Sequence, residues 1–400
     1  MNQCSDAADE TSDVVIVGGG ASGLSLAQQL TAIGCVTVIL VEAPDGPCRP
    51  PERTWCYWDE GISAFGEVVS ASWSRLRVHD SKGGVIAMNP SPLRYRMVRS
   101  RAFEQWVHSR LARSPGARVL RATADTVRDT ADGAEVRCTA PDGRALVLHA
   151  RYVFDSRPLR ALPPARTQLF QHFRGWFVRT ETDRFDASVV DLMDFRVPQP
   201  SHGLAFGYVL PLASNRALVE YTEFSRMPLT TAAYERALGR YSRETLKLGA
   251  FTIDTAEQGV IPMTDARFPR RIGTAIFRIG TAGGATRPAT GYTFAAVQRQ
   301  SQAIAGAMRH GHVITPRPHG RRAMTMDAIL LRALDTGRID GRTFFTRLFR
   351  SIPPERLLRF LNGGTSLREE WGIGLHTPIG PMLRTAVELP FLPRRHHPVS

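Results

Sequence analysis

The chain has 400 residues, of which 43% are hydrophobic and 22% are charged, with 34 Gly and 27 Pro. These proportions exclude a disordered or fibrous protein and are typical of a loop-rich globular α/β protein. The formal net charge of +14 comes mainly from arginines along the whole chain. No short Lys/Arg block decides between nucleic acid, an anionic membrane surface and a generally arginine-rich composition, and we expect no nucleic-acid partner.

The cysteines and the hydropathy of the chain bear on metal binding, export and membrane insertion. The five cysteines are scattered and form no CxxC pair, which predicts a reducing cytoplasm and no metal site. Residues 1–12 lack the basic and apolar segments of a signal peptide. Residues 14–41 carry no charge and are long enough to cross a bilayer, but they contain five glycines and β-branched residues at both ends. This stretch instead predicts a strand, a glycine-rich turn, a helix and a second strand.

In chain order, the first unit is a strand over residues 13–17, a turn over 18–20, a helix over 21–33 and a strand over 36–41. By default this is a right-handed βαβ unit. A helix is expected over 100–111, followed by short strands over 119–154 with turns at 131–133 and 141–143. Residues 170–224 are aromatic and β-branched, which predicts an antiparallel sheet, our candidate substrate lobe. A strand over 276–279 then leads into a second glycine cluster and a helix.

The C-terminal part predicts amphipathic helices. Beyond residue 321, apolar residues recur at helical spacing in two groups, Ile329, Leu330, Leu331, Leu334 and Phe344, Phe345, Leu348, Phe349. Such helices form either a cap on the core or a face that contacts a membrane. The expected fold is therefore α/β, with a discontinuous Rossmann-like domain (1–160 and 270–320), an interleaved antiparallel-sheet substrate domain (161–269) and a C-terminal helical region (321–400).

The clearest binding signal is the first glycine cluster. The segment GGGASG at residues 18–23 satisfies GxGxxG, follows a predicted strand and opens a predicted helix, and Glu42 ends the next strand. Gly18 permits the tight turn, Gly20 admits a pyrophosphate, and Gly23 allows helix and strand to pack closely. Glu42 is suited to accept hydrogen bonds from a ribose. Dinucleotide binding follows, but this cluster alone does not separate NAD from FAD.

A second glycine cluster favours FAD. The segment GTAGG contains Gly280, Gly283 and Gly284, follows a predicted strand and precedes a predicted helix. A site for NAD needs only the first cluster, whereas the second supplies a flavin-side turn. Many flavoproteins place an acid after the first glycine of this cluster to meet the ribityl chain, and this chain has Thr281 there.

Five segments resemble the lycopene β-cyclase family, in that family's usual order. They are RTWCYW (53–58), VFDSR (153–157), FGYVLP (206–211), LVEYTEFS (218–225) and GTAGGATRPATGY (280–292). The likeness extends from about residue 14 to residue 377. It implies a two-lobe flavoprotein with noncovalent FAD that must be reduced, NAD(P)H as the reductant, and Glu220 as the catalytic acid.

The resemblance also implies a substrate and a location. Lycopene and other linear carotenoids would be cyclised to β-rings, giving β-carotene by way of γ-carotene, without net redox change. A substrate of this hydrophobicity implies a peripheral membrane protein on the cytoplasmic, inner face of the cell membrane. We expect the apolar C-terminal helices to make that contact, through residues such as Phe345 and Phe349.

This chemistry needs a proton source and a dry place for a cation. A carboxylic acid in an apolar pocket keeps its proton at neutral pH because burial disfavours the anion. Glu220 and Glu223 lie three residues apart on a predicted strand, so only one can face the substrate. The same argument places Asp191 and Asp194 on opposite faces, so that at most one assists Glu220. Aromatic residues are candidates for a polyene tunnel, namely Trp55, Tyr57, Trp58, Trp176 and Tyr208.

Three alternatives stay open at this point. A flavin-dependent monooxygenase shares the two-lobe plan but consumes reductant in every turnover. Another isoprenoid cyclase would use the same acid. A non-enzymatic carotenoid- or lipid-binding protein would account for the basic charge and the apolar helices.

Overall fold

The computed structural model describes residues 8–60 and 65–397, and its first sheet is built around β1 (Ala8–Val17). This strand pairs in parallel with β2 (Val38–Glu42) on one side and with β11 (Ala145–Asp155) on the other. Val14 and Ile16 face one apolar cluster, while Val15 and Val17 face another. The strand is therefore apolar on both faces, as parallel strands covered on two sides usually are. The predicted strand, turn, helix and strand are confirmed, although β1 begins earlier than expected.

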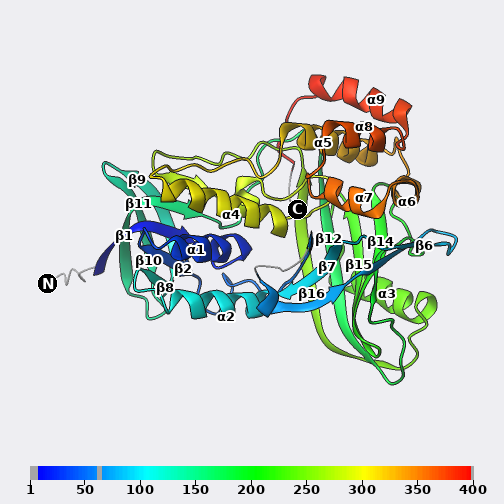
Figure 1. The fold of residues 1–400 in the computed structure, drawn as a ribbon, viewed down its shortest axis with the longest axis horizontal. Helices are drawn as coiled ribbons and strands as arrows, with labels where there is room; N and C mark the ends of the chain where they lie inside the picture. Colours follow the sequence, from blue (N-terminus) through cyan, green and yellow to red (C-terminus); the bar gives the residue numbers. More distant parts are fainter. Residues whose placement is uncertain (1–7, 61–64, 398–400) are drawn as a thin grey trace.

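Edge strands and three helices complete this lobe (Figure 1). β8 (Ala117–Arg121) pairs with β2, and β10 (Gly133–Thr139) and β9 (Thr123–Thr130) follow β11. The helices α1 (Ala21–Ile33), α2 (Ser100–Leu111) and α4 (Phe294–Arg309) share one apolar cluster with the sheet. The short β17 (Ile276–Arg278) also pairs in parallel with β11. Two separate stretches of chain therefore build the lobe.

The second sheet is larger and mainly antiparallel. Its strands are, in order, β16 (Phe251–Thr264), β12 (Gln168–Thr180), β15 (Arg216–Ser225), β14 (Leu204–Ala213), β13 (Val189–Asp194), β5 (Arg75–His79) and β6 (Val85–Met88). The antiparallel sheet predicted over residues 170–224 is confirmed. Since β5 and β6 belong to it through hydrogen bonding, part of the range 1–160 lies outside the first sheet. The domain limits given above stay a prediction.

Different elements cover the two faces of the second sheet. Helix α3 (Thr231–Arg240) and the turn Tyr241–Thr245 pack on one face. On the other face lie α5 (Arg321–Asp335), α6 (Gly341–Ser351) and α7 (Pro354–Leu361). A small sheet of β3 (Thr54–Glu60), β7 (Leu93–Arg99) and β4 (Val69–Trp73) lies between the two larger ones in Figure 1. The two faces of the second sheet are thus covered by different helices.

The C-terminal helices form a cap, and one expectation about them is wrong. Phe345 and Phe349 of α6 are only 7% and 4% exposed and pack against the sheet, so they form no membrane-contacting face. The apolar residues at helical spacing in α6 are therefore core residues. The cap continues through α8 (Leu367–Gly374), α9 (Ile379–Glu388) and the turn Leu389–Phe391. In the part of the chain that the structure describes, no helix has both the length and the hydrophobicity needed to cross a membrane.

Candidate active site

The first glycine loop has the geometry that its sequence predicts. Gly18 has φ +107°, a backbone conformation that side chains with a Cβ rarely adopt. A Cβ on Gly23 would lie 1.8 Å from the carbonyl oxygen of Gly18, so α1 can approach β1 closely only with glycine there. A Cβ on Gly20 would meet nothing within 4 Å, and no described side chain caps the N-terminus of α1. The helix end is therefore open to an anionic group.

The second glycine loop lies against the first. Gly280 has φ +64°, and a Cβ there would lie 2.4 Å from Oγ of Ser22 in α1. Gly283 and Gly284 close the short turn that follows β17, and a Cβ on Gly283 would be 2.5 Å from the carbonyl oxygen of Arg278. Two clusters some 260 residues apart in sequence therefore meet in space. This is the arrangement that one extended dinucleotide would need.

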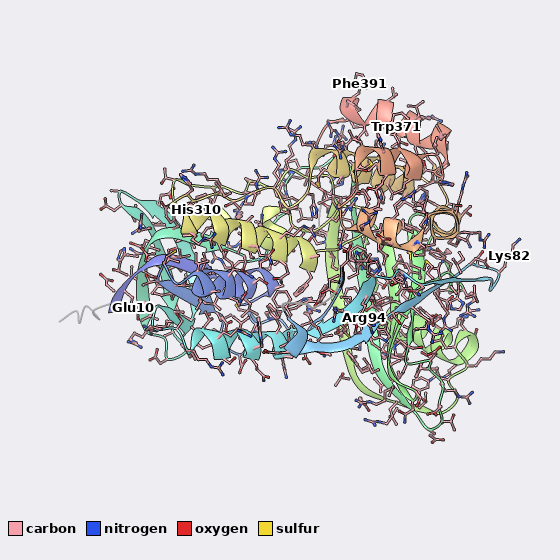
Figure 2. The ribbon with its side chains drawn as sticks, viewed as in Figure 1. Glu10, Lys82, Arg94, His310, Trp371 and Phe391 are labelled. Atoms are coloured by element: carbon pink, nitrogen blue, oxygen red, sulfur yellow. The ribbon has the colours of Figure 1, made fainter. Side chains whose placement is uncertain are left out.

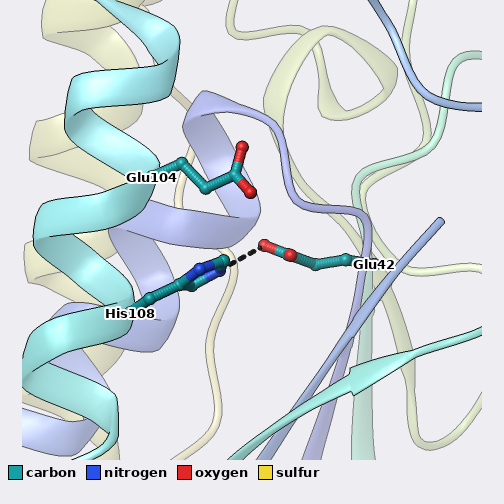
Figure 3. Close-up of side chains that lie close together, drawn as sticks. All are labelled: Glu42, Glu104 and His108. Atoms are coloured by element: carbon teal, nitrogen blue, oxygen red, sulfur yellow. Dashed lines mark hydrogen bonds and ion pairs between the residues drawn. The ribbon is translucent and has the colours of Figure 1, made fainter. Parts of the chain in front are cut away.

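Glu42 lies at the end of β2, next to the first loop. Its carboxylate is 1% exposed, and Oε1 lies 3.0 Å from Nε2 of His108. Figure 3 marks this contact with a dashed line. Glu104 completes a group of three potential metal ligands. Arg121 lies 3.1 Å from an oxygen of each carboxylate, and Arg49 pairs with Glu104 as well. Cationic side chains thus already accompany both acids, and the group forms an ion-pair network.

A cavity of about 590 Å³ extends from the glycine loops to the second sheet. Gly20, Ser22, Gly280 and Thr281 line its first end, and β15 forms part of the other. The four β15 residues in the wall are Leu218, Glu220, Thr222 and Phe224. Alternate residues of a strand point to the same face, and these four residues all belong to one face of β15. The cavity therefore lies on the face that carries Glu220.

Glu220 is a buried acid with few polar partners. It is 6% exposed, and the hydroxyl of Thr222 donates a hydrogen bond of 2.6 Å to its Oε1. Burial raises the pKa of Glu220 to about 8, opposed by the Thr222 bond and supported by the negative charge of Glu257. The carboxyl group is therefore mostly protonated at neutral pH, as a general acid must be.

Sequence reasoning missed the second carboxylate, Glu257. In β12, which lies between β15 and β16, Gly175 pairs with Glu220 of β15 on one side and with Glu257 of β16 on the other. Gly175 has no side chain, and a Cβ there would lie 2.8 Å from Cδ1 of Leu218 and 3.5 Å from Oε2 of Glu220. Both acids line the cavity. An isolated glycine inside an aromatic strand signals such a close approach and was the available clue.

Cations and hydroxyls hold Glu257. Thr54 donates a hydrogen bond of 2.8 Å to Oε2, and Nη1 of Arg99 lies 3.1 Å from the same oxygen. Burial raises the pKa of Glu257, whereas Thr54, Arg99 and Arg53 oppose that rise. Arg53 also donates to the backbone oxygen of Gln258. Arg53 and Thr54 thus fasten β16, and with Arg99 they oppose the rise that burial causes in the pKa of Glu257.

Glu223 points to the opposite face of the sheet, as the alternation predicts. Its carboxylate accepts a hydrogen bond of 3.1 Å from Tyr221 and lies 3.8 Å from Nε2 of His172. His172 is fully buried against Tyr234 of α3, and burial lowers the pKa of His172 to about 4. Neither Glu223 nor His172 lines the cavity. Both belong to the structural contact between the sheet and α3.

The expectation that Asp191 and Asp194 point to opposite faces is wrong. A β-bulge between them changes the register of β13, so both carboxylates act on the pKa of Tyr241 instead of facing opposite ways. Asp191 pairs with His79 at 2.9 Å, and Asp194 accepts a hydrogen bond of 2.9 Å from Tyr241. Neither lines the cavity or influences the pKa of Glu220.

Only some of the candidate aromatic residues reach the cavity. Trp55 and Tyr208 line it, and Tyr208 lies opposite Glu220 in the sheet. Tyr95 and Tyr292 also line it, and the hydroxyls of Tyr95 and Tyr208 are 2.7 Å apart. The remaining candidates pack elsewhere in the core, namely Tyr57, Trp58 and Trp176. The wall near Glu220 thus combines aromatic rings with one protonated acid.

Comparisons with known proteins agree with this geometry. Residues 13–387 match the family model described as lycopene cyclase protein. The chloroplastic lycopene beta cyclase of Nicotiana tabacum is 23% identical over 318 residues, an alignment that covers 74% of this chain. The same alignment covers 60% of that protein, so the chain spans about three fifths of the length of this curated relative.

Solved structures of low sequence identity share the fold. A flavoprotein/dehydrogenase from Cytophaga hutchinsonii superposes with a TM-score of 0.64 at 12% identity, covering 94% of this chain and 99% of that one. A geranylgeranyl bacteriochlorophyll reductase-like protein from Thermoplasma acidophilum gives 0.61 at 14% identity, covering 96% and 100%. The predicted two-lobe α/β flavoprotein fold with C-terminal helices is therefore confirmed. By its family match, the chain belongs to the lycopene cyclase protein family.

Proposed function

We propose that the chain is an FAD-dependent lycopene cyclase that closes β-rings on the ends of lycopene, giving β-carotene by way of γ-carotene. The observation that carries the proposal is Glu220, a buried carboxyl group with a pKa of about 8 in a cavity that both glycine loops also line. A protonated acid in an apolar cavity suits a reaction that begins by protonating an alkene.

In this proposal, Glu220 is the proton donor. Its Oε1 accepts the hydrogen bond from Thr222, which leaves Oε2 to carry the acidic proton. Glu220 transfers that proton to the terminal double bond, and the neighbouring double bond attacks the resulting cation. The ring cation then loses a proton to a carboxylate of the cavity, either Glu257 or the deprotonated Glu220, which completes the ring. In its ionised form, which Arg99 and Thr54 favour against the effect of burial, Glu257 helps to keep Glu220 protonated and contributes negative charge to the cavity of the cation.

The residues of the two glycine loops suit FAD. Gly18, Gly20 and Gly23 with the open N-terminus of α1 would hold the pyrophosphate, and Glu42 a ribose. Gly280, Gly283 and Gly284 would form the flavin-side turn. FAD held by these residues in its reduced form would supply electron density that stabilises a cation, and NAD(P)H is the proposed reductant. The aromatic rings of Trp55 and Tyr208 exclude water from the same space.

The proposed location is peripheral, on the cytoplasmic face of the membrane in which the carotenoid dissolves. The net charge of +14 supports attraction to an anionic lipid surface. Neither a nucleic-acid partner nor a metal is part of this proposal.

An anaerobic assay tests the proposed function. Purified protein is incubated with lycopene in liposomes and chemically reduced FAD, and the products are identified by chromatography and absorption spectra. We expect β-carotene and transient γ-carotene, no net oxidation of the flavin, and no product with oxidised FAD. A product that forms only with oxygen and consumes reduced flavin would instead identify a monooxygenase, and protein that binds lycopene without converting it would identify a carrier.

A further inference from the structure

The last helices expose an unusual apolar face. Of the 13 large apolar side chains exposed among the described residues, seven lie between residues 367 and 391. They follow one another at a spacing of four, as Leu367, Trp371, Leu375, Ile379, Leu383, Val387 and Phe391. Trp371 is 74% exposed and Phe391 83%, and both are labelled on the cap in Figure 2, Phe391 at its outer edge. A contiguous exposed apolar face of this kind marks an interaction site.

A second cavity opens at this face. It has a volume of about 740 Å³ and lies among α5, α6, α8 and α9. Trp371, Leu375 and Leu383 line it and are all more than half exposed, so its mouth lies within the exposed apolar face. Its inner end shares wall residues with the cavity of Glu220, among them Phe345 and Phe349. The two cavities therefore adjoin, and together they extend from the acid to the surface.

The charges around the mouth are mainly positive. The nearby acids are paired, Glu369 with Arg359, Glu370 with Arg322, and Glu388 with Arg332 and Arg338. Within residues 8–60 and 65–397, Arg321, Arg368 and Arg384 form no such ion pair, and all three are exposed. Apolar side chains surrounded by excess arginine complement an anionic lipid surface, in which acyl chains lie beneath negative head groups.

We propose that the exposed face of α8, α9 and the turn Leu389–Phe391 docks on an anionic lipid bilayer, and that the second cavity admits a long apolar substrate from that bilayer. The proposal rests on the proposed function for the identity of the substrate, but the docking surface does not depend on it. Phe345 and Phe349 then line the path along which the substrate reaches Glu220.

Vesicle binding tests the docking surface without any catalysis. Purified holoprotein is co-sedimented with phosphatidylglycerol/phosphatidylcholine vesicles, comparing wild type with a Trp371→Glu, Leu383→Glu double variant. We expect the partition coefficient of the double variant to fall at least about tenfold, since each side chain loses most of its apolar transfer free energy. A matched control, Ile253→Glu with Ile272→Glu, alters apolar residues that are 45% and 42% exposed elsewhere, and it should bind as wild type does.

If the two double variants bind vesicles equally well, the exposed face is not the surface that docks on the bilayer. Analytical ultracentrifugation without vesicles tests whether a second copy of the chain covers the face instead. If the wild type is a dimer and the Trp371→Glu, Leu383→Glu variant is a monomer, the face is a contact between two copies and the lipid proposal is wrong. Ala386→Phe narrows the second cavity and tests the path. It should leave vesicle binding and flavin content intact while lowering cyclisation of vesicle-borne lycopene at least tenfold, and unchanged turnover would overturn the path. If wild type converts no lycopene, the proposed function fails, but the vesicle result still stands.

Discussion

Replacement of Glu220 by glutamine separates proton donation from every other role of that side chain. Glutamine keeps the size of glutamate and can still accept the hydrogen bond from Thr222, but it has no acidic proton. At its ordinary value of 4.5, the pKa of a glutamate would leave about 0.3% of the acid protonated at pH 7. The raised pKa of about 8 leaves about 90% protonated, so the net shift, in which burial is the largest cause, contributes roughly 300-fold in available acid.

We therefore expect Glu220→Gln to lose activity by at least the ~10²–10⁴-fold that general acid catalysis typically contributes, since no water replaces the acid. The assay measures cyclisation in lycopene liposomes with reduced FAD, at equal flavin occupancy. In wild type the rate should fall as pH rises through about 8, because the acid is protonated only below its pKa.

Glu223→Gln is the internal control because its side chain faces α3. It should retain activity within a few-fold of wild type. If Glu220→Gln stayed near wild type while Glu223→Gln was inactive, the assignment of the acid would be wrong.

Three further substitutions test the acid beside Glu220, the first glycine loop and a buried ion pair. Glu257→Gln should move the alkaline limb of the pH–rate profile to lower pH, because the charge of Glu257 helps to raise the pKa of Glu220, and an unmoved limb would contradict this coupling. Gly20→Val should fold, as its Cβ meets nothing within 4 Å, yet lose FAD by absorbance, and wild-type flavin content would refute the loop's role. Asp327→Asn should lower the free energy of unfolding by about 3–5 kcal/mol in urea titrations, since it leaves Arg287 buried without its ionic partner, and a loss below about 1 kcal/mol would show that the pair is dispensable.

Local patterns predicted the elements that depend on local physics. The glycines at 18, 20 and 23, the β-branched runs and the two-residue alternation in β15 each act within a few neighbouring residues, and the structure has the predicted strands and helices there. The alternation also predicted that Glu220 and Glu223 would point apart. The alternation could not predict which face of β15 lines the cavity, because the same two-residue pattern is obtained whichever face does so.

Contacts between distant segments decided the rest. Glu257 and Glu220 line one cavity only because β15 and β16 both pair with β12, where both acids lie opposite Gly175. The bulge in β13 shifts the register after Asp191, and no local pattern marked it. Apolar residues at helical spacing look alike whether they pack on a sheet or face outward, so Phe345 and the exposed Trp371 differ only through what covers them. The sequence by itself therefore determined the elements, the glycine loops and the family resemblance, whereas burial, and with it the raised pKa of Glu220, exists only where the folded lobes remove water from the carboxyl group.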